Sequence, residues 1–219
     1  MGIDFEEWFH PELIQKNIKI NDKKLSVVNG IDKILNLLSK RNTFATFFVV
    51  GELIEKKPEL LDKIIDNGHE IAFHTMYHTR LDAENYKNQF NSELEIFKKL
   101  TNNKSKGFRA PSFSLNENTS WAIDSLKKNG YIYDSSIAPV KTRLYGVPKA
   151  EKNPYKIDSG DIKKNQNSSN FLEFPLLTTT IFGKTIMAAG GFYIRTLPLY
   201  FIKKEISSRN KLNFPATMY

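Results

Sequence analysis

Three of the four histidines in this chain lie in one short segment, GHEIAFHTMYH (68–78). His74 and His78 are four residues apart, a spacing that places two imidazoles on one side of a helical turn, with Cβ atoms about 5–6 Å apart. Two imidazoles in this arrangement can share a divalent ion, although two ligands do not complete a site. The alternative is a pair of surface histidines hydrogen-bonded to the backbone. We interpret His69 as a turn residue.

Acidic residues that could complete such a site lie in IDFEEWF (3–9). Asp4 and Glu6 would share one face of an extended strand, and Glu7 would point to the other. The neighbouring apolar residues favour burial, and a buried acid requires a partner, for which a metal ion is one candidate. One carboxylate would then bind the ion, while another accepts a proton from the attacking water. The alternative is a solvated acidic loop.

An arginine lies in the apolar stretch GFRAPSF (107–113). If Arg109 is buried, it must be paired. It could form a structural ion pair, or it could tune a catalytic carboxylate, because a nearby guanidinium lowers the pKa of a carboxyl group and keeps it ionised. Asp134 is a candidate partner, although an Asp that precedes serines is more often a turn residue.

The elements that must position these residues alternate between short β-rich runs and helical patterns. Strands are predicted at 2–5, 43–50, 70–74, 107–113, 131–137 and 171–177, and helices at 25–41, 58–67, 82–101, 117–129 and 197–209. This order predicts an α/β protein with a parallel sheet or barrel, whose functional groups lie at the carboxyl ends of the strands. We expect an exposed loop at 151–170, a hairpin around 183–192 and a strand-like run at 212–219.

The composition narrows the class of protein. A chain of 219 residues with 40% hydrophobic residues predicts a single domain over 1–219 with a buried core. The net charge of +8 is not concentrated in a basic block interleaved with aromatics, so we expect no nucleic-acid partner, while a preference for anionic surfaces or glycans remains. The chain has no cysteine, which excludes disulfides and thiolate ligands.

The apolar runs are too short to span a bilayer, which takes about 20 residues. No basic segment typical of a signal peptide opens the chain. We therefore expect a soluble, cytoplasmic protein without a membrane span. The oligomeric state is not predicted.

Together these stretches resemble the polysaccharide deacetylase family, also called carbohydrate esterase family 4 or the NodB-homology family. GHEIAFHTMYH is similar to its second motif, GFRAPSF to the third and YIYDSSI (131–137) to the fourth. IDFEEWFH (3–10) resembles a variant first motif, D-x-E-D-W-F, found in one branch, and FLEFPL and AAGGFYIR (188–195) resemble that branch too. The likeness covers most of the chain in the same order.

The resemblance implies a distorted (β/α) barrel of about seven strands. It implies hydrolysis of the acetamide on an N-acetylated sugar or polysaccharide, with a divalent metal, commonly zinc, as cofactor. In this family's scheme the ion would be held by Glu6, His74 and His78. Asp4 would be the catalytic base, and Arg109 would orient it.

Two parts of this transfer leave alternatives. The sequence can also be aligned as FEEW, which makes Glu6 the base and Glu7 the ligand; we prefer the first alignment, because Asp4 and Glu6 share one face. Candidates for lining a sugar groove are Trp8, Phe113, Gly190 and Gly191, although residues of these types are more often packing or turn residues than sugar ligands.

One departure from the family concerns the general acid. The family's fifth motif supplies a histidine near the C-terminus, but no histidine follows His78. LNFPATMY (212–219) resembles the strand leading into that motif, so we expect a C-terminally truncated chain. The alternatives are a glycan-binding pseudo-enzyme without the acid, a same-fold amidohydrolase acting on a small non-sugar amide, and a basic scaffold protein whose histidines bind no metal.

Overall fold

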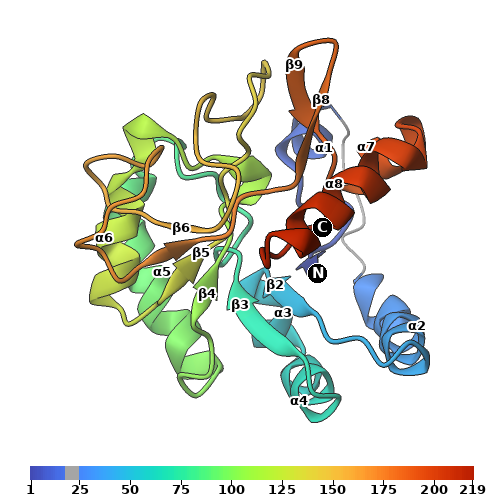
Figure 1. The fold of residues 1–219 in the computed structure, drawn as a ribbon. Helices are drawn as coiled ribbons and strands as arrows, with labels where there is room; N and C mark the ends of the chain where they lie inside the picture. Colours follow the sequence, from blue (N-terminus) through green and yellow to red (C-terminus); the bar gives the residue numbers. More distant parts are fainter. Residues whose placement is uncertain (18–24) are drawn as a thin grey trace.

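A mostly parallel, seven-stranded sheet organises the fold in the computed structural model, which describes residues 1–17 and 25–219 (Figure 1). The strand order is β1-β2-β3-β4-β5-β7-β6, and all neighbours are parallel except β6, which runs antiparallel to β7. The strands are β1 (Gly2–Phe5), β2 (Thr46–Val49), β3 (Glu70–Phe73), β4 (Gly107–Phe108), β5 (Tyr133–Asp134), β6 (Tyr155–Lys156) and β7 (Leu172–Glu173).

Helices connect the strands and pack around the sheet (Figure 1). The predicted helices at 25–41, 58–67, 82–101 and 117–129 correspond to α2 (Val27–Lys40), α4 (Glu59–Asp66), α5 (Tyr86–Leu100) and α6 (Trp121–Lys128). Three short helices were not predicted, α1 (Glu12–Asn17), α3 (Gly51–Lys56) and α7 (Gly191–Thr196), because six residues carry too little periodicity. Among the described residues, no helix is long and apolar enough to cross a lipid bilayer.

The last part of the chain forms a smaller layer beside the sheet. A two-stranded hairpin, β8 (Thr178–Ile181) and β9 (Lys184–Met187), is followed by α7 (Gly191–Thr196) and α8 (Leu199–Lys211). The hairpin therefore begins a few residues earlier than the predicted 183–192. These elements surround a second apolar cluster, in which Leu176, Leu177, Ala188 and Ala189 are fully buried.

The C-terminal segment, residues 217–219, links β1, at one edge of the sheet, to the chain that continues from β7 near the other edge. Gly2 N, in β1, donates a hydrogen bond to Met218 O at 2.8 Å, and Leu177 N, in the chain that continues from β7, donates to Thr217 O at 3.0 Å. Thr217 also forms a parallel bridge with Leu176. The segment therefore connects the β1 edge with the far side of the sheet, in agreement with the predicted distorted (β/α) barrel of about seven strands.

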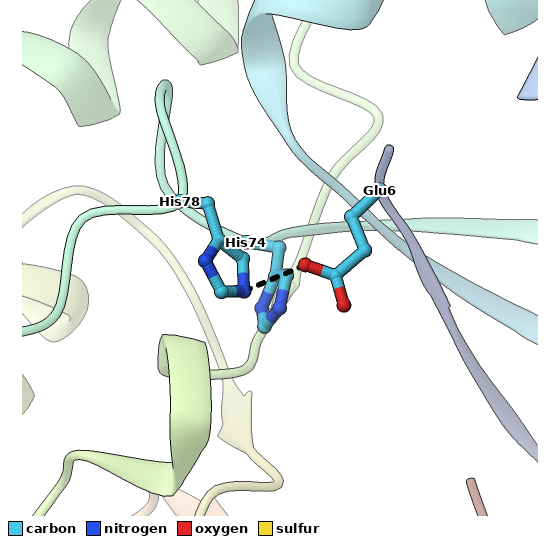
Figure 2. A group of neighbouring side chains, drawn as sticks. All are labelled: Glu6, His74 and His78. Carbon is cyan, nitrogen blue, oxygen red and sulfur yellow. Dashed lines mark ion pairs between the residues drawn. The ribbon is translucent and has the colours of Figure 1, made fainter. Parts of the chain in front are cut away.

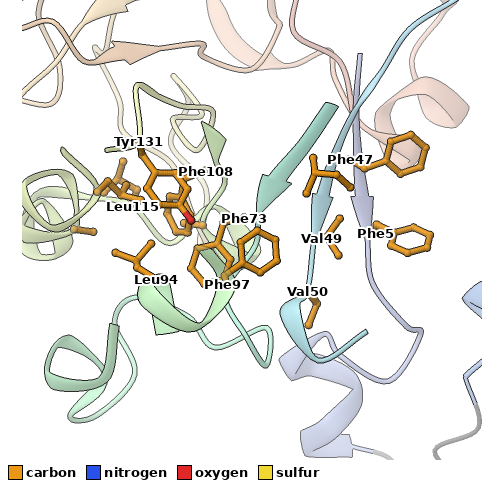
Figure 3. Packing of buried hydrophobic residues seen from close by; sticks show 14 of the residues in the cluster. Phe5, Phe47, Val49, Val50, Phe73, Leu94, Phe97, Phe108, Leu115 and Tyr131 are labelled. Atoms are coloured by element: carbon orange, nitrogen blue, oxygen red, sulfur yellow. The ribbon is translucent and has the colours of Figure 1, made fainter. Parts of the chain in front are cut away.

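Successive side chains along the strands face two different environments. Phe47 and Val49 of β2 are fully buried beneath the helices, where Phe73 packs on Phe97 with ring centroids 4.6 Å apart (Figure 3). Phe48, between them in sequence, points to the opposite side, where its ring stacks on the Arg109 guanidinium at 3.9 Å. Successive side chains of a strand point to opposite faces, so the same short strands build both the core and the functional interior.

The prediction of an exposed loop at 151–170 is wrong in part, because some residues of this segment are buried. Tyr155, Ile157 and Ile162 are buried in the main core, and β6 pairs with β7. The Tyr155 hydroxyl donates to the Ile162 carbonyl oxygen, which fixes one turn of the segment. Three apolar anchors among many Lys, Asn and Ser residues are too sparse to give a periodic signal, although they are enough to bury the segment.

Two buried acids face each other on β5 and β7. Asp134 and Glu173 are register partners, and both are fully buried. Glu173 Oε1 accepts from Ile137 N at 2.9 Å, and Asp134 accepts from the Ser136 hydroxyl. Burial, and then the neighbouring Asp134 carboxylate, raise the pKa of Glu173 well above its usual value. Glu173 is therefore the member of the pair that holds a proton more readily, and its Oε2 is buried without a hydrogen-bond partner among the described residues.

This pair predicts a pH dependence of stability. A carboxyl group whose pKa is higher in the folded than in the unfolded chain lowers the free energy of unfolding as pH rises from the unfolded value, about 4.3, through the folded value. Glu173→Gln keeps the neutral hydrogen bonds and cannot titrate, so its unfolding free energy should decline less than that of the wild type between weakly acidic and neutral pH. Urea unfolding at both pH values measures this; parallel profiles for wild type, Glu173→Gln and the exposed control Glu95→Gln would contradict it.

Candidate metal centre

The candidate centre is built where two parallel strands end. Glu6 directly follows β1 and His74 directly follows β3, and both strands pair with β2, so their carboxyl ends meet at one edge. Thr75 and His78 have positive φ angles of 59° and 56°. Such left-handed residues are uncommon outside glycine and tend to occur at functional sites. Here they turn the chain back, so that the His78 and His74 rings lie 5.1 Å apart.

Three potential ligand atoms converge in this turn. One atom each from Glu6, His74 and His78 lie within 4.8 Å of one another. His78 Nε2 is 2.7 Å from Glu6 Oε2 (Figure 2), but this buried oxygen has no partner in hydrogen-bond geometry within the described chain. Two imidazoles and one carboxylate form a donor set suited to a divalent ion such as zinc, and the buried oxygen without a hydrogen bond lies where a ligand atom is needed.

The orientation of His74 is fixed by the next strand. Its Nδ1 donates to the Arg109 carbonyl oxygen at 2.6 Å, which leaves Nε2 with a lone pair toward the centre. Burial lowers the pKa of His74 to about 4, although the Asp4 charge acts in the opposite direction. The ring is therefore neutral at pH 7, which is the form that binds metals.

An ion pair between Asp4 and Arg109 lies beside this centre. Arg109 is fully buried, and its Nη1 donates to Asp4 Oδ1 at 2.7 Å. Nε and Nη2 donate to the carbonyl oxygen and the hydroxyl of Ser135, at 2.9 and 2.8 Å. Burial alone would raise the pKa of Asp4, but the Arg109 guanidinium, together with the nearby His74 and His78, holds that pKa below its usual value. Asp4, rather than Asp134, is the acidic partner of Arg109.

Glu7 occupies a different environment from Glu6. Its Oε1 accepts from Val27 N at 2.8 Å and its Oε2 from the Ser26 hydroxyl at 2.7 Å, at the start of α2. Glu7 therefore satisfies the first turn of a helix, whose N–H groups lack partners within the helix itself. The structure brings Glu6, and not Glu7, to the two histidines.

The predicted sugar-groove residues are found in several settings. Phe113 is buried, and its ring centroid lies 4.8 Å from that of Tyr219. Both rings are within 6 Å of the Arg109 guanidinium carbon, at 5.9 and 5.8 Å. Gly190 lies against Tyr219, whereas Gly191 begins α7 with open space around it. Trp8, two residues past Glu6, is 49% exposed.

Gly190 is required by both its backbone and its neighbour. Its φ is +93°, and a Cβ there would lie 2.4 Å from the Tyr219 ring. We expect Gly190→Ala to lower the free energy of unfolding by roughly 1–3 kcal/mol, the usual cost of such a strained residue, and to displace Tyr219. Urea unfolding measures this. Gly191→Ala, which meets nothing within 4 Å, is the matched control; equal stability of the two variants would contradict the account.

Sequence reasoning missed His10, which is buried next to the centre. Its Nε2 lies 2.8 Å from Glu52 Oε1, and its ring stacks on His78 with centroids 6.1 Å apart. A cavity of about 400 Å³ opens here and is lined by His10, Tyr77, His78 and Arg80 among others. The sequence feature that could have identified His10 is its position as the last residue of IDFEEWFH (3–10). His69 lies elsewhere, packed on Phe47 with ring centroids 5.4 Å apart.

A larger cavity, of about 590 Å³, lies at the opposite end of the barrel. Its walls include Gly2, Thr46, Glu70 and Leu172, which stand at the beginnings of β1, β2, β3 and β7. The candidate ligands follow the opposite ends of these strands, but the cavity is also lined by Arg109 and Ser135, so it extends to the arginine that pairs with Asp4.

The fold and this geometry define an α/β-barrel protein with a candidate divalent-ion centre at the carboxyl ends of its strands. The family model described as polysaccharide deacetylase matches residues 21–133, about half of the chain, and the chain belongs to this family. The match includes His74, His78 and Arg109 but begins after Asp4 and Glu6. A second model, described as a domain of unknown function (DUF3473), matches residues 135–219.

Relatives and solved structures agree with this assignment. A peptidoglycan deacetylase-like protein of Gibberella zeae is 29% identical over 121 residues, covering 53% of this chain and 35% of its own length. A peptidoglycan-N-acetylglucosamine deacetylase of Bacillus cereus is 31% identical over 118 residues, covering 47% and 43%. This chain thus spans less than half of either relative.

A solved structure supports the fold. A protein described as a probable polysaccharide deacetylase from Pseudomonas aeruginosa PAO1 superposes with a TM-score of 0.57 and 17% identity, over 86% of this chain and 58% of that one. At this identity the likeness concerns the fold alone.

Proposed function

We propose that this protein is a metal-dependent deacetylase that hydrolyses the acetamide of N-acetylated sugars in a polysaccharide. One observation carries the proposal: an ionised Asp4, paired with a buried Arg109, lies beside the converging Glu6, His74 and His78. The names of the relatives, which include peptidoglycan and chitooligosaccharide deacetylases, support the substrate class.

The roles of the residues follow from their positions. Glu6, His74 and His78 would hold the ion, which supplies a Lewis acid for the amide carbonyl and makes water a stronger acid. Asp4 would accept the proton of the attacking water and then pass that proton to the leaving amine, while Arg109 keeps Asp4 ionised and fixed in position before the attack. His74 stays neutral and oriented through its hydrogen bond to the Arg109 carbonyl oxygen. We propose that Trp8, Phe113, Gly190 and Gly191 contribute to the groove that receives the sugar.

We also propose that residues 1–219 act as one domain. The main supports are the hydrogen bond from Gly2 N to Met218 O and the contact of Tyr219 with Phe113. The second cluster thereby becomes a wall of the barrel rather than a separate unit. A native continuation past Tyr219, and a cytoplasmic location, stay predictions.

Acetate release tests the proposal. The wild type, loaded with zinc, should release acetate from a chitooligosaccharide or from peptidoglycan and leave a small non-sugar amide intact. Binding of the glycan without acetate release would instead support the pseudo-enzyme alternative raised by the absence of a histidine after His78. Turnover of the small amide alone would overturn the sugar assignment.

A further inference from the structure

The excess of positive over negative charge in this protein comes from its C-terminal part. Residues 135–219 contain 13 Lys and Arg against 5 Asp and Glu, whereas residues 1–134 contain 19 of each. The net charge of +8 therefore belongs entirely to the part that follows β5. An uneven distribution of this kind creates a local field that attracts anions.

Within this part a groove concentrates the lysines. It has a volume of about 480 Å³ and lies between the segment 139–152 and β9. Its lining combines four exposed ammonium side chains with an apolar floor: Lys141, Lys149, Lys152 and Lys184, with Val140 and Ile186. Among the residues that the structure describes, none that lines the groove is acidic.

Some lysines elsewhere on the surface pair with carboxylates, whereas the four groove lysines form no ion pair among the described residues. Lys56, Lys63 and Lys163 each pair with a carboxylate. Within residues 1–17 and 25–219, no ion pair involves any of the four groove lysines, and the one hydrogen bond made by a groove ammonium runs from Lys152 Nζ to the Thr185 hydroxyl at 3.2 Å. Four cations gathered without a counter-charge repel each other, and an anionic ligand would relieve that repulsion.

The backbone holds one of these lysines in an uncommon conformation. Lys149 has a φ of +69°, in the left-handed region that glycine or asparagine adopts at lower cost.

The groove and the candidate centre border the same apolar cluster. Val140, from the groove lining, packs in this cluster together with Phe113, and the Phe113 ring lies 5.9 Å from the Arg109 guanidinium carbon.

We infer that this groove binds an anionic stretch of polysaccharide, in which carboxylate- or phosphate-bearing sugars meet the four lysines. The apolar faces of the sugar rings would lie on Pro148 and Ile186, which line the groove and are at least partly exposed. A concave groove with a small apolar floor suits a polymer chain better than a flat lipid surface. The inference rests on the proposed function and narrows its substrate class to polymers that carry acidic groups near the N-acetylated sugar.

A charge-matched pair of variants tests the inference. In the groove variant, Lys141, Lys149, Lys152 and Lys184 are all changed to Gln. In the control variant, four exposed lysines on α2, α5 and α6 are changed to Gln: Lys33, Lys40, Lys99 and Lys128. Calorimetry would compare binding of an oligogalacturonate, a neutral chitohexaose, inorganic phosphate and vesicles containing phosphatidylserine.

We expect the wild type to bind the oligogalacturonate in a salt-sensitive manner, the groove variant to bind it about tenfold or more weakly, and the control variant to match the wild type within about twofold. If both variants lose affinity for the oligogalacturonate equally, the effect comes from net charge alone, which would overturn the inference. Binding of phosphate alone, or of vesicles but not the oligomer, would also overturn it.

The activity arm separates this inference from the proposed function. Acetate release from neutral chitohexaose should be the same in the groove variant and the wild type. If neither the wild type nor any variant releases acetate, but binding of the oligogalacturonate still depends on the four lysines, the proposed function fails and the groove remains a binding site. If acetate release persists and oligomer binding ignores the lysines, the groove inference alone fails.

Discussion

Asp4→Asn is expected to lower the rate of acetate release by roughly 10²–10⁴-fold, the usual contribution of a positioned general base. Asp4 is the carboxylate whose pKa the Arg109 guanidinium holds down against the effect of burial, so it is ionised and able to accept a proton at neutral pH. Asparagine preserves an oxygen for Arg109 Nη1, now 2.7 Å from Oδ1, but it cannot take up a proton. Steady-state acetate release from a chitooligosaccharide measures the effect.

The same variant should bind a divalent ion as the wild type does, because Asp4 is outside the cluster of Glu6, His74 and His78. Asp124→Asn, at an exposed position on α6, is the control for removal of one carboxylate and should retain full activity. Asp4→Asn with more than about a tenth of the wild-type rate would show that another group is the base.

Arg109→Leu is expected to lower the free energy of unfolding by about 3 kcal/mol, the lower part of the range for breaking a buried ion pair, because the Asp4 side chain is still 17% exposed. The variant leaves the Asp4 carboxylate without its cation and removes the donors to Ser135. Its activity should fall as well, with the acidic limb of the pH–rate profile moved to higher pH as the pKa of Asp4 rises. Urea unfolding and the pH–rate profile are the measurements.

A double variant separates loss of the pair from loss of the arginine itself. Asp4→Asn combined with Arg109→Leu leaves no unpaired charge, so it should be more stable than the sum of the single changes predicts. Strict additivity of the two unfolding free energies would indicate that Asp4 and Arg109 do not interact in the folded protein.

The sequence predicted the part of the fold that carries strong local patterns. The runs TFATFFVV and EIAFH are apolar and bounded by helical segments, and both became central parallel strands, β2 and β3. Because the histidine motif begins with the last residue of EIAFH, its place at a strand end could be predicted, as could its nearness to IDFEEWF. The preference for Glu6 over Glu7 as ligand came from the two-residue period of a strand, and the structure places the two side chains accordingly.

Other features depend on contacts between distant residues, which local patterns do not encode. The bridge from Thr217 to Leu176 joins strand-like runs that are irregular on their own. The burial of His10 depends on Glu52, which is 42 positions away. The pairing of Asp134 with Glu173 required the register of β5 and β7. In each case the sequence shows the residue type, while tertiary packing decides its partner.

The central claim is that Glu6, His74 and His78 hold the ion on which acetate release depends, and one titration tests it most directly. Chelator-treated protein is titrated with Zn²⁺ while bound ion and acetate release are followed together, for the wild type, for His78→Ala and for His69→Gln as the control. We predict that activity returns in proportion to one bound ion per chain in the wild type and in His69→Gln, while His78→Ala binds roughly a hundredfold more weakly or worse and stays inactive. Acetate release that survives removal of the ion, or equal ion binding by the wild type and His78→Ala, would contradict the account.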